Sequence, residues 1–176
     1  VAAGQGHDGK TVPQLFPDLG PLVHVHHAGN APSTADGAAL VLLASGAAAR
    51  RHGLRPRARV LSTAEASVAI TQIGAVDATC KALTRAGLSP AEIDLWEVRD
   101  SFAAVTLHYQ RALSVPMECY NVNGSSIALG HPMGATGAML IGTLIDELEL
   151  RGLRRGVVAL TGAAGVASAA VLEIVT

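Results

Sequence analysis

From Ala58 onward, short apolar runs alternate with segments of helical periodicity. The apolar runs predict strands at 58–61, 93–98, 157–160 and 168–175. The helical spacing predicts helices at 77–86, at 102–113 and from 139 to 151. Gly87 and Gly152 follow two of these helices, where glycine readily takes the left-handed conformation that ends a helix. Strands that alternate with helices and close with two successive strands are typical of an α/β layered sandwich with a mixed sheet.

The chain before Ala58 is less regular. Residues 1–21 are rich in Gly, Pro and Asp and indicate a loop. Residues 22–27 lean towards a strand, and residues 47–52 predict a short helix that Gly53 can end.

Five arginines fall between Arg50 and Arg59. Such a group could bind phosphates, but the glycine and the proline inside this stretch favour a solvent-exposed boundary between two structural units. We therefore expect a domain boundary at Pro56, with one unit at residues 1–55 and a second at 56–176.

Composition excludes several classes of protein. The 176 residues carry 13 Lys and Arg against 14 Asp and Glu, and this balance argues against nucleic-acid binding and against a polybasic membrane binder. Hydrophobic residues make up 49% of the chain, which is enough for a packed core. Every apolar run is interrupted well before the ~20 residues that a membrane-spanning helix needs, so we expect no membrane span.

Cys80 and Cys119 are too few for a disulfide framework and lack the spacing of a metal site. They fit two reduced cysteines in a cytoplasmic protein. No signal peptide is visible, and the chain begins at Val1 with residues that indicate neither a helix nor a strand. We therefore expect this chain to be a piece of a longer polypeptide.

The most chemically suggestive segment is 121–137, a polar, glycine-rich stretch directly before the most regular helix. His131 lies there between Gly130 and Pro132. An imidazole near a helix N-terminus feels the positive end of the helix dipole, which lowers its pKa and keeps it neutral, as a general base must be. A lone histidine is more often structural, but the rigid frame of glycine and proline favours a functional one here.

Three other segments carry residues of interest. Residues 96–103 run from a strand end into a helix, where sites of α/β proteins collect. The turn 161–165 has backbone amides that could hold an oxyanion, although its composition alone indicates a structural turn. His24, His26 and His27 have the type and spacing of metal ligands, but no carboxylate or cysteine lies near them, so we expect no metal site.

The segment 121–138 resembles the signature NVNGGAIALGHPLGATGA of the thiolase family, which comprises acyl-CoA acetyltransferases and 3-ketoacyl-CoA thiolases. The identical positions are 121–124, 127–132 and 134–138. Residues 28–39 resemble the family's AGNAS…NDGAA, residues 94–103 resemble its DLFEINEAFA, and the last two strands resemble the region around its CxGGGxG. The similarity extends from about Val25 to the end of the chain.

The resemblance implies a fold. A thiolase has two similar halves, each a layered α/β/α sandwich with a five-stranded mixed sheet, so we expect five strands here. Residues 56–176 correspond to the C-terminal domain, and residues 1–55 to the tail end of the N-terminal half plus a loop. The acyl-accepting cysteine of the family belongs to the absent N-terminal half, and neither Cys80 nor Cys119 lies in a matching context.

The resemblance also implies roles for particular residues. His131 matches the histidine that takes the proton from the acylated cysteine and helps to hold the thioester oxygen. Phe102, Gly130 and Gly165 are the positions at which we expect contact with the substrate.

Several positions depart from the family pattern. Thr161 stands where the family has a second cysteine that exchanges a proton with the substrate, and a threonine hydroxyl is too weak an acid for that exchange near neutral pH. Arg99 stands where the family has an Asn or His that orients a water, and this fixed cation could fill the pocket or bind a carboxylate. Ala163 and Ala164 replace glycines, and Pro32 replaces a serine that contacts CoA.

Two functions follow from the sequence. The first is the C-terminal part of a thiolase-type acyltransferase that moves acyl groups to or from CoA in fatty-acid or related lipid metabolism. CoA is then a substrate, and no cofactor is expected. The second is a thiolase-like protein that binds acyl-CoA or a partner subunit without turnover. In either case we expect this chain alone to be inactive, because it lacks the cysteine half, and to form a homo-oligomer or bind that half.

Overall fold

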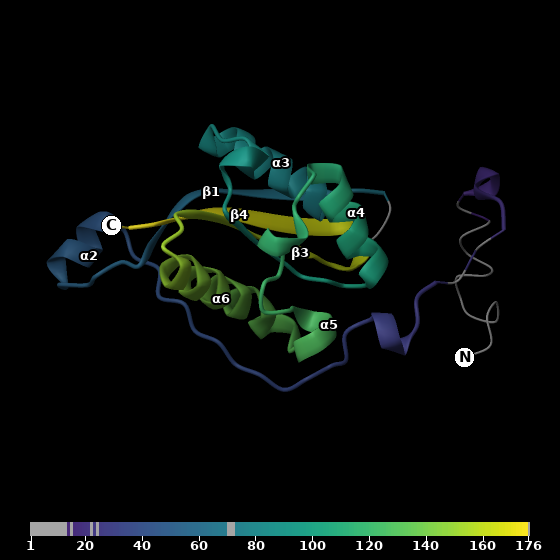
Figure 1. Cartoon of the computed structure of the whole chain (residues 1–176), viewed down its shortest axis with the longest axis horizontal. Helices are drawn as coiled ribbons and strands as arrows, with labels where there is room; N and C mark the ends of the chain where they lie inside the picture. The colour runs from purple at the N-terminus through teal and green to yellow at the C-terminus, as the bar shows by residue number, and fades with distance from the viewer. Residues whose placement is uncertain (1–13, 15, 22, 24, 70–72, 176) are drawn as a thin grey trace.

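The structure is a computed structural model that describes residues 14, 16–21, 23, 25–69 and 73–175. A central sheet carries helices on both faces (Figure 1). Its strands are β1 (Ala58–Ser67), β2 (Leu95–Val98), β3 (Arg155–Thr161) and β4 (Val166–Ile174). They lie in the order β1-β4-β3-β2. β2 is parallel to β3, whereas β4 is antiparallel to both β3 and β1, so the sheet is mixed as predicted.

The expectation of five strands is wrong for the described residues, in which the sheet has four. Tyr120 lies beside the edge strand β2 and forms one parallel bridge with Trp96. The next residue, Asn121, takes a left-handed conformation with a φ of 45°. Pairing ends there after a single residue, because a strand needs extended backbone. The segment 22–27 is also predicted to lean towards a strand. Residues 22 and 24 lie outside the described residues, and residues 23 and 25–27 are not part of the sheet.

Two helices, α3 (Ala75–Ala86) and α4 (Ala103–Leu113), cover one face of the sheet (Figure 1). Their bounds agree with the predicted helices, and α3 ends at a glycine with positive φ. Three aromatic rings pack under α4. Tyr109 lies between Trp96 and Tyr120, with ring centroids 6.2 and 6.0 Å away. These rings and the small buried residues of α3 belong to one core cluster.

The opposite face of β2 and β3 is covered by the long helix α6 (Thr136–Arg151), which the short helix α5 (Ser126–Leu129) precedes. The apolar face of α6 joins a second core cluster, formed by Leu95, Leu140, Leu144, Leu148, Val158 and Leu172. Leu144 lies directly over Gly156, where a β-carbon would overlap its side chain. Glycine on β3 therefore lets the helix approach the sheet closely. None of the helices in the described part of the chain combines the length and the apolar run that crossing a bilayer requires.

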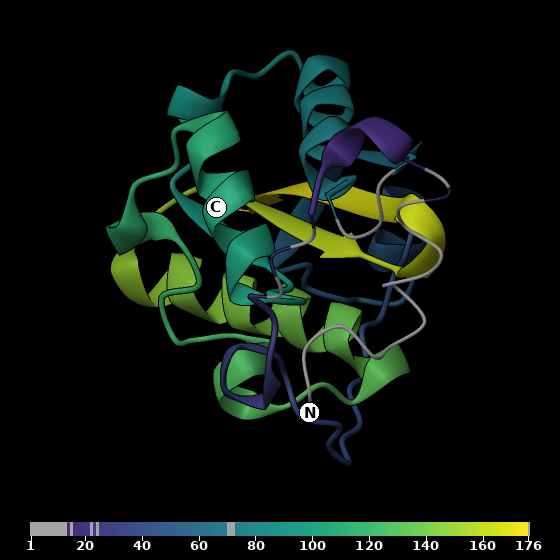
Figure 2. The same ribbon diagram turned by 90° about the vertical axis from the view of Figure 1, so that its right-hand side faces the viewer.

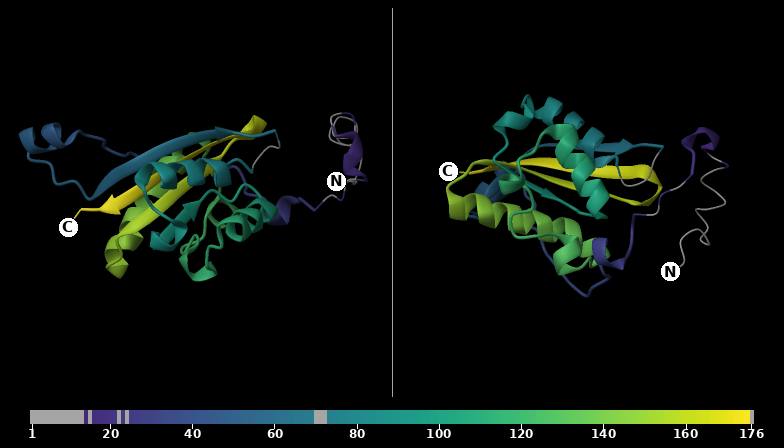
Figure 3. Two further views of the ribbon diagram at one scale, coloured as in Figure 1. Left: turned by 90° about the horizontal axis from the view of Figure 1, so that it is seen from above. Right: turned by 45° about the vertical axis from the view of Figure 1, so that its right-hand side comes forward.

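The first described residues lie outside this sandwich. Residues 31–44 pass on the α6 side of the molecule (Figures 1 and 2) and expose Leu40, Leu42 and Leu43. They lead to the short helix α2 (Gly46–Arg51), which begins where the Ser45 hydroxyl accepts the Ala48 amide at 3.2 Å. Figure 3 shows α2 at the end of the molecule opposite the short helix at Pro17–Leu19.

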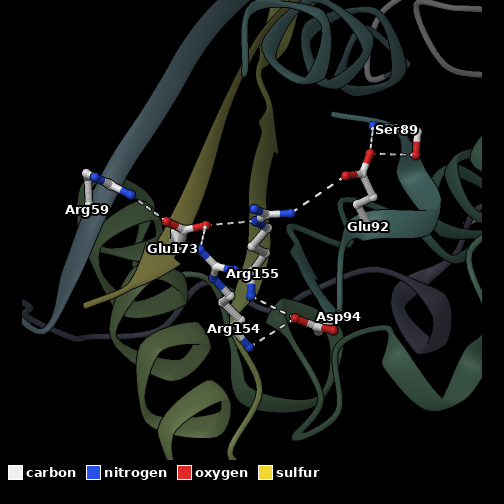
Figure 4. A network of polar contacts seen from close by, with 7 residues as sticks. All are labelled: Arg59, Ser89, Glu92, Asp94, Arg154, Arg155 and Glu173. Carbon is white, nitrogen blue, oxygen red and sulfur yellow. Dashed lines mark hydrogen bonds and ion pairs between the residues drawn. The ribbon is translucent and has the colours of Figure 1, made fainter. Parts of the chain in front are cut away.

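Ion pairs join the start of β1 to β4 and to α6, and the start of β3 to β4. Glu173 on β4 receives Arg59, Arg154 and Arg155 at 2.5, 3.2 and 2.8 Å (Figure 4). Hydrogen bonds from Arg155 and Arg59 lower the pKa of Glu173 to about 2. Arg57 contacts Asp146 and Glu149 of α6, each at 2.6 Å. Two of the five arginines near the expected boundary thus have carboxylate partners.

Glu97 is a buried carboxyl group on β2, with 1% of its surface exposed. Within the described residues no hydrogen bond of good geometry reaches its oxygens, although the nearby amide of Val122 lowers its pKa in part. Burial, followed by repulsion from Glu147, raises the pKa of Glu97 to about 8. The folded protein therefore binds this proton more tightly than the unfolded chain does.

We expect Glu97→Gln to remove a pH dependence of stability. Because the pKa of Glu97 is raised from 4.5 to about 8, the free energy of unfolding should fall as the pH rises through this window, by at most about 1.4 kcal/mol per pH unit. The variant should lack this slope and be the more stable protein at about pH 8. Urea unfolding between about pH 5 and 8 measures both, with the exposed Glu65→Gln as control. Equal slopes in wild type and Glu97→Gln would contradict the assignment.

Candidate active site

The parallel strands β2 and β3 end at the same edge of the sheet. Val98 pairs with Ala159, and the Arg99 amide continues the ladder to the Ala159 carbonyl at 2.9 Å. Arg99 therefore lies beside Thr161, the last residue of β3. The fold brings together two predicted site residues that are 62 positions apart in the sequence.

Arg99 and Thr161 are in direct contact. Nη1 of Arg99 donates to the Thr161 carbonyl at 2.6 Å and to the Ser101 hydroxyl at 2.9 Å. The hydroxyls of Ser101 and Thr161 are hydrogen-bonded to each other, and both residues are buried. Burial lowers the pKa of Arg99, but a guanidinium stays charged in proteins. The result is a fixed cation that holds two buried hydroxyl groups.

The loop that leads to His131 is attached to β2 by side chains. Oδ1 of Asn121 accepts from the Val98 amide at 2.7 Å, and Nδ2 donates to the Val98 carbonyl at 2.9 Å. The side chain thus bonds to Val98 as a neighbouring strand would. Asp100 adds a second attachment, because its Oδ1 accepts the Ile127 amide at 3.0 Å at the start of α5. Both contacts fix the distance between the end of β2 and the histidine loop.

His131 is held through its backbone and through one ring nitrogen. Its amide donates to the Ser33 carbonyl at 2.8 Å, and its Nδ1 lies 2.7 Å from the Thr136 hydroxyl. Burial lowers the pKa of this partly exposed ring, and the charge of Arg99 lowers it further. The sequence predicted a lowered pKa for His131 from the nearby helix N-terminus. The structure gives the same direction, but its causes are burial and the charge of Arg99. With Nδ1 occupied, Nε2 is the nitrogen that remains for acid–base chemistry.

The remaining predicted residues are Phe102, Gly130 and Gly165. Gly130 has a φ of 93°, and a β-carbon there would overlap Ala35, so only glycine fits directly before the histidine. Phe102 stands before α4 and packs edge to face on His26, with ring centroids 4.4 Å apart. Gly165 lies in the turn between β3 and β4, where its carbonyl accepts the Val68 amide at 3.0 Å. Their contact with a substrate stays a prediction.

Hydrogen bonds within the turn after Thr161 agree with its structural interpretation. The Gly162 amide donates to the Val166 carbonyl at 2.8 Å. Ala164 has a φ of 58°, a left-handed conformation that costs an alanine roughly 1–2 kcal/mol. A cavity of about 690 Å³ lies beside the turn, and it is lined by Glu65, Ala66, Ser67, Lys81, Leu160, Thr161, Gly162, Val166, Ala167 and Ser168. Of the predicted site residues, Thr161 lines this cavity, as far as the described residues show.

Two of the histidines considered as metal ligands have other contacts. Nδ1 of His27 accepts the Gly29 amide at 3.0 Å, and the His26 ring packs on Phe102. His24 lies outside the described residues. In the parts of the chain that the structure describes, no three His, Cys, Asp or Glu side chains gather as metal ligands would.

Sequence reasoning missed the roles of Asn121, Ser101 and Thr136. Asn121 and Thr136 both lie in the glycine-rich segment, and a hydroxyl in the first turn of the helix after a histidine is a signal that could have been used. Ser101 gave no such signal, because its hydroxyl partner Thr161 is 60 residues away.

Comparison with known proteins gives consistent results. A family model described as "Thiolase, C-terminal domain" matches residues 54–174. The acetyl-CoA acetyltransferase of Rhizobium meliloti is 41% identical over 83% of this chain and 38% of its own length. The beta-ketoadipyl-CoA thiolase of Pseudomonas aeruginosa is 44% identical over 93% of this chain and 42% of its own length. The crystal structure of the acetyl-CoA acetyltransferase of Bacillus anthracis superposes with a TM-score of 0.81 at 39% identity, covering 84% of this chain and 38% of that one. The chain thus spans about two fifths of the length of these relatives.

We expect Arg99→Gln to raise the pKa of His131 towards its ordinary value, because the substitution removes the positive charge that now disfavours the imidazolium. The rise should be incomplete, since burial remains the larger cause. An NMR titration of the His131 ring measures this shift, with the exposed Arg111→Gln on α4 as control. An unchanged or lower pKa in Arg99→Gln would show that the guanidinium does not act on the ring.

Proposed function

Because the chain belongs to the thiolase family, we propose that it is the C-terminal part of a thiolase-type acyl-CoA acyltransferase, with acyl-CoA and CoA as its substrates. The observation that carries the proposal is the state of His131, a partly exposed imidazole with a lowered pKa and Nδ1 already bonded. A ring in this state is neutral near pH 7 and offers Nε2 as a base. The names of the relatives, acetyl-CoA acetyltransferase and beta-ketoadipyl-CoA thiolase, support acyl-CoA as the substrate class.

The proposed chemistry moves one proton through His131. Nε2 takes the proton of a cysteine thiol, which the resemblance assigns to an N-terminal half, and the thiolate attacks the thioester carbonyl of acyl-CoA. The carbon–sulfur bond to CoA breaks, and the leaving CoA thiolate takes the proton back from His131. The products are an acylated cysteine and CoA, and the imidazole is neutral again.

The contact between Arg99 and Thr161 limits which reactions this site supports. Making or breaking a carbon–carbon bond next to a thioester needs a group that moves a proton at the α-carbon. The Thr161 hydroxyl is bonded to Ser101 and lies 3.4 Å from Nη1 of Arg99. A threonine hydroxyl is too weak an acid, and too weak a base, to serve as that group near neutral pH. This site therefore supports acyl transfer and thioester hydrolysis, whereas thiolysis of a 3-ketoacyl chain should be slow.

An oligomer or a complex with an N-terminal half, a cytoplasmic location and a place in lipid metabolism belong to the same proposal. The exposed leucines of residues 40–43 support the association, because contiguous exposed apolar surface commonly marks a contact face. CoA takes part as a substrate, and the proposed steps need no cofactor.

We expect the double variant Arg99→Asn, Thr161→Cys of the full-length protein to cleave acetoacetyl-CoA with CoA on the order of 100-fold faster than wild type, the scale of one positioned acid–base group. Thr161→Cys alone should gain little, since the Arg99 guanidinium still lies against position 161. The decrease in absorbance of the magnesium enolate of acetoacetyl-CoA follows the reaction.

His131→Ala in the double-variant background is the matched control and should abolish both cleavage and covalent acylation. Wild type that cleaves acetoacetyl-CoA as fast as the double variant would refute the limit assigned to Thr161. Full acylation in the His131→Ala background would refute the role of His131 as base.

A further inference from the structure

The Thr136 hydroxyl contacts Nδ1 of His131, and the proposed function gives this contact no role. Its Oγ1 lies 2.7 Å from Nδ1 of His131, and only 3% of Thr136 is exposed. Thr136 is the first residue of α6, so its backbone is fixed by the helix that packs on the sheet. A β-branched side chain has few χ1 rotamers in a helix, and its buried methyl group restricts them further. The hydroxyl is therefore held in place before the ring reacts.

We propose that Thr136 is the positioning residue of His131 and that it fixes the tautomer with the proton on Nδ1. The tautomer does not depend on the proposed function; only the role of Nε2 as a base rests on it. In the neutral Nδ1–H tautomer the hydroxyl accepts from Nδ1, and Nε2 carries the lone pair of a base. The reverse arrangement, with Thr136 donating to Nδ1, would place a hydrogen on Nε2 and make it a donor.

The proton cycle favours the first arrangement. When the ring is protonated both nitrogens donate, so Thr136 must accept from Nδ1 in that state. If it also accepts in the neutral state, the same hydrogen bond persists as Nε2 gains and loses a proton. No group next to the ring then has to reorient during the transfer, which lowers the cost of the step.

A hydroxyl also suits the charge of this site. A carboxylate at the position of Thr136 would orient the ring but stabilise the imidazolium. Threonine orients the ring without adding a charge, while burial and Arg99 keep it neutral. Together with the bond from the His131 amide to Ser33, the contact fixes the ring at both its backbone and one nitrogen.

Nitrogen-15 NMR of the imidazole rings of this chain tests the assignment without any activity. His131→Gln identifies the signals of His131 among the 7 histidines. In wild type at a pH where the ring is neutral, we expect the Nδ1–H tautomer. Thr136→Val, which has the same shape and no hydroxyl, should shift His131 to the Nε2–H tautomer, and Thr136→Ser should retain Nδ1–H. A wild-type ring in the Nε2–H form, or a Thr136→Val ring that keeps Nδ1–H, would overturn the proposal.

Thr143→Val on the same helix is the control for a methyl replacing a hydroxyl, and it should leave the His131 signals unchanged. If Thr136→Val does not fold, the wild-type spectrum and Thr136→Ser still decide the tautomer. In the full-length protein, Thr136→Val should lower kcat for acyl transfer on the order of 100-fold with little change in KM, and Thr136→Ser should restore most of it. The expected tautomers without measurable acyl transfer would count against the proposed function but not against this assignment.

Discussion

The site depends on how the peptide of Val98 is held. On one side Val98 pairs with β3, and on the other side the side chain of Asn121 bonds both its amide and its carbonyl. The first contact places Arg99 against Thr161, and the second places the histidine loop at the same edge of the sheet. A single amide side chain thus does what a further strand would do. Because pairing with β2 ends at Asn121, the chain leaves the sheet there and continues into the loop that carries His131.

The sequence predicted the elements whose signals are local. Glycine ends α3 and α6 because Gly87 and Gly152 take the left-handed conformation at almost no steric cost. The expected fifth strand failed for an equally local reason, since the left-handed Asn121 stops pairing after Tyr120. The contacts that Thr161 makes with Arg99 and Ser101 could not be predicted in this way. They join residues about 60 positions apart, and their partners follow from strand register and not from spacing.

The electrostatics of the site combine one fixed charge with neutral partners. Arg99 places a cation among buried hydroxyl groups, and its field disfavours protonation of His131. Thr136 bonds the same ring without charge. This combination favours a neutral ring, because a carboxylate beside the imidazole would raise its pKa. In the proposed chemistry, acyl transfer uses His131 and a cysteine of an N-terminal half, whereas chemistry at the α-carbon would need a further acid–base group at the position of Thr161.

The support of His131 crosses the boundary expected at Pro56. The carbonyl that receives its amide belongs to Ser33, and Ala35 packs against the glycine before it, whereas the family model matches residues 54–174. His131 is thus supported by residues on both sides of this boundary, although the family model begins at residue 54. A fragment trimmed to residues 54–174 would keep the sheet, Arg99, Thr161 and His131, yet would lose Ser33 and Ala35, which hold the backbone at the histidine.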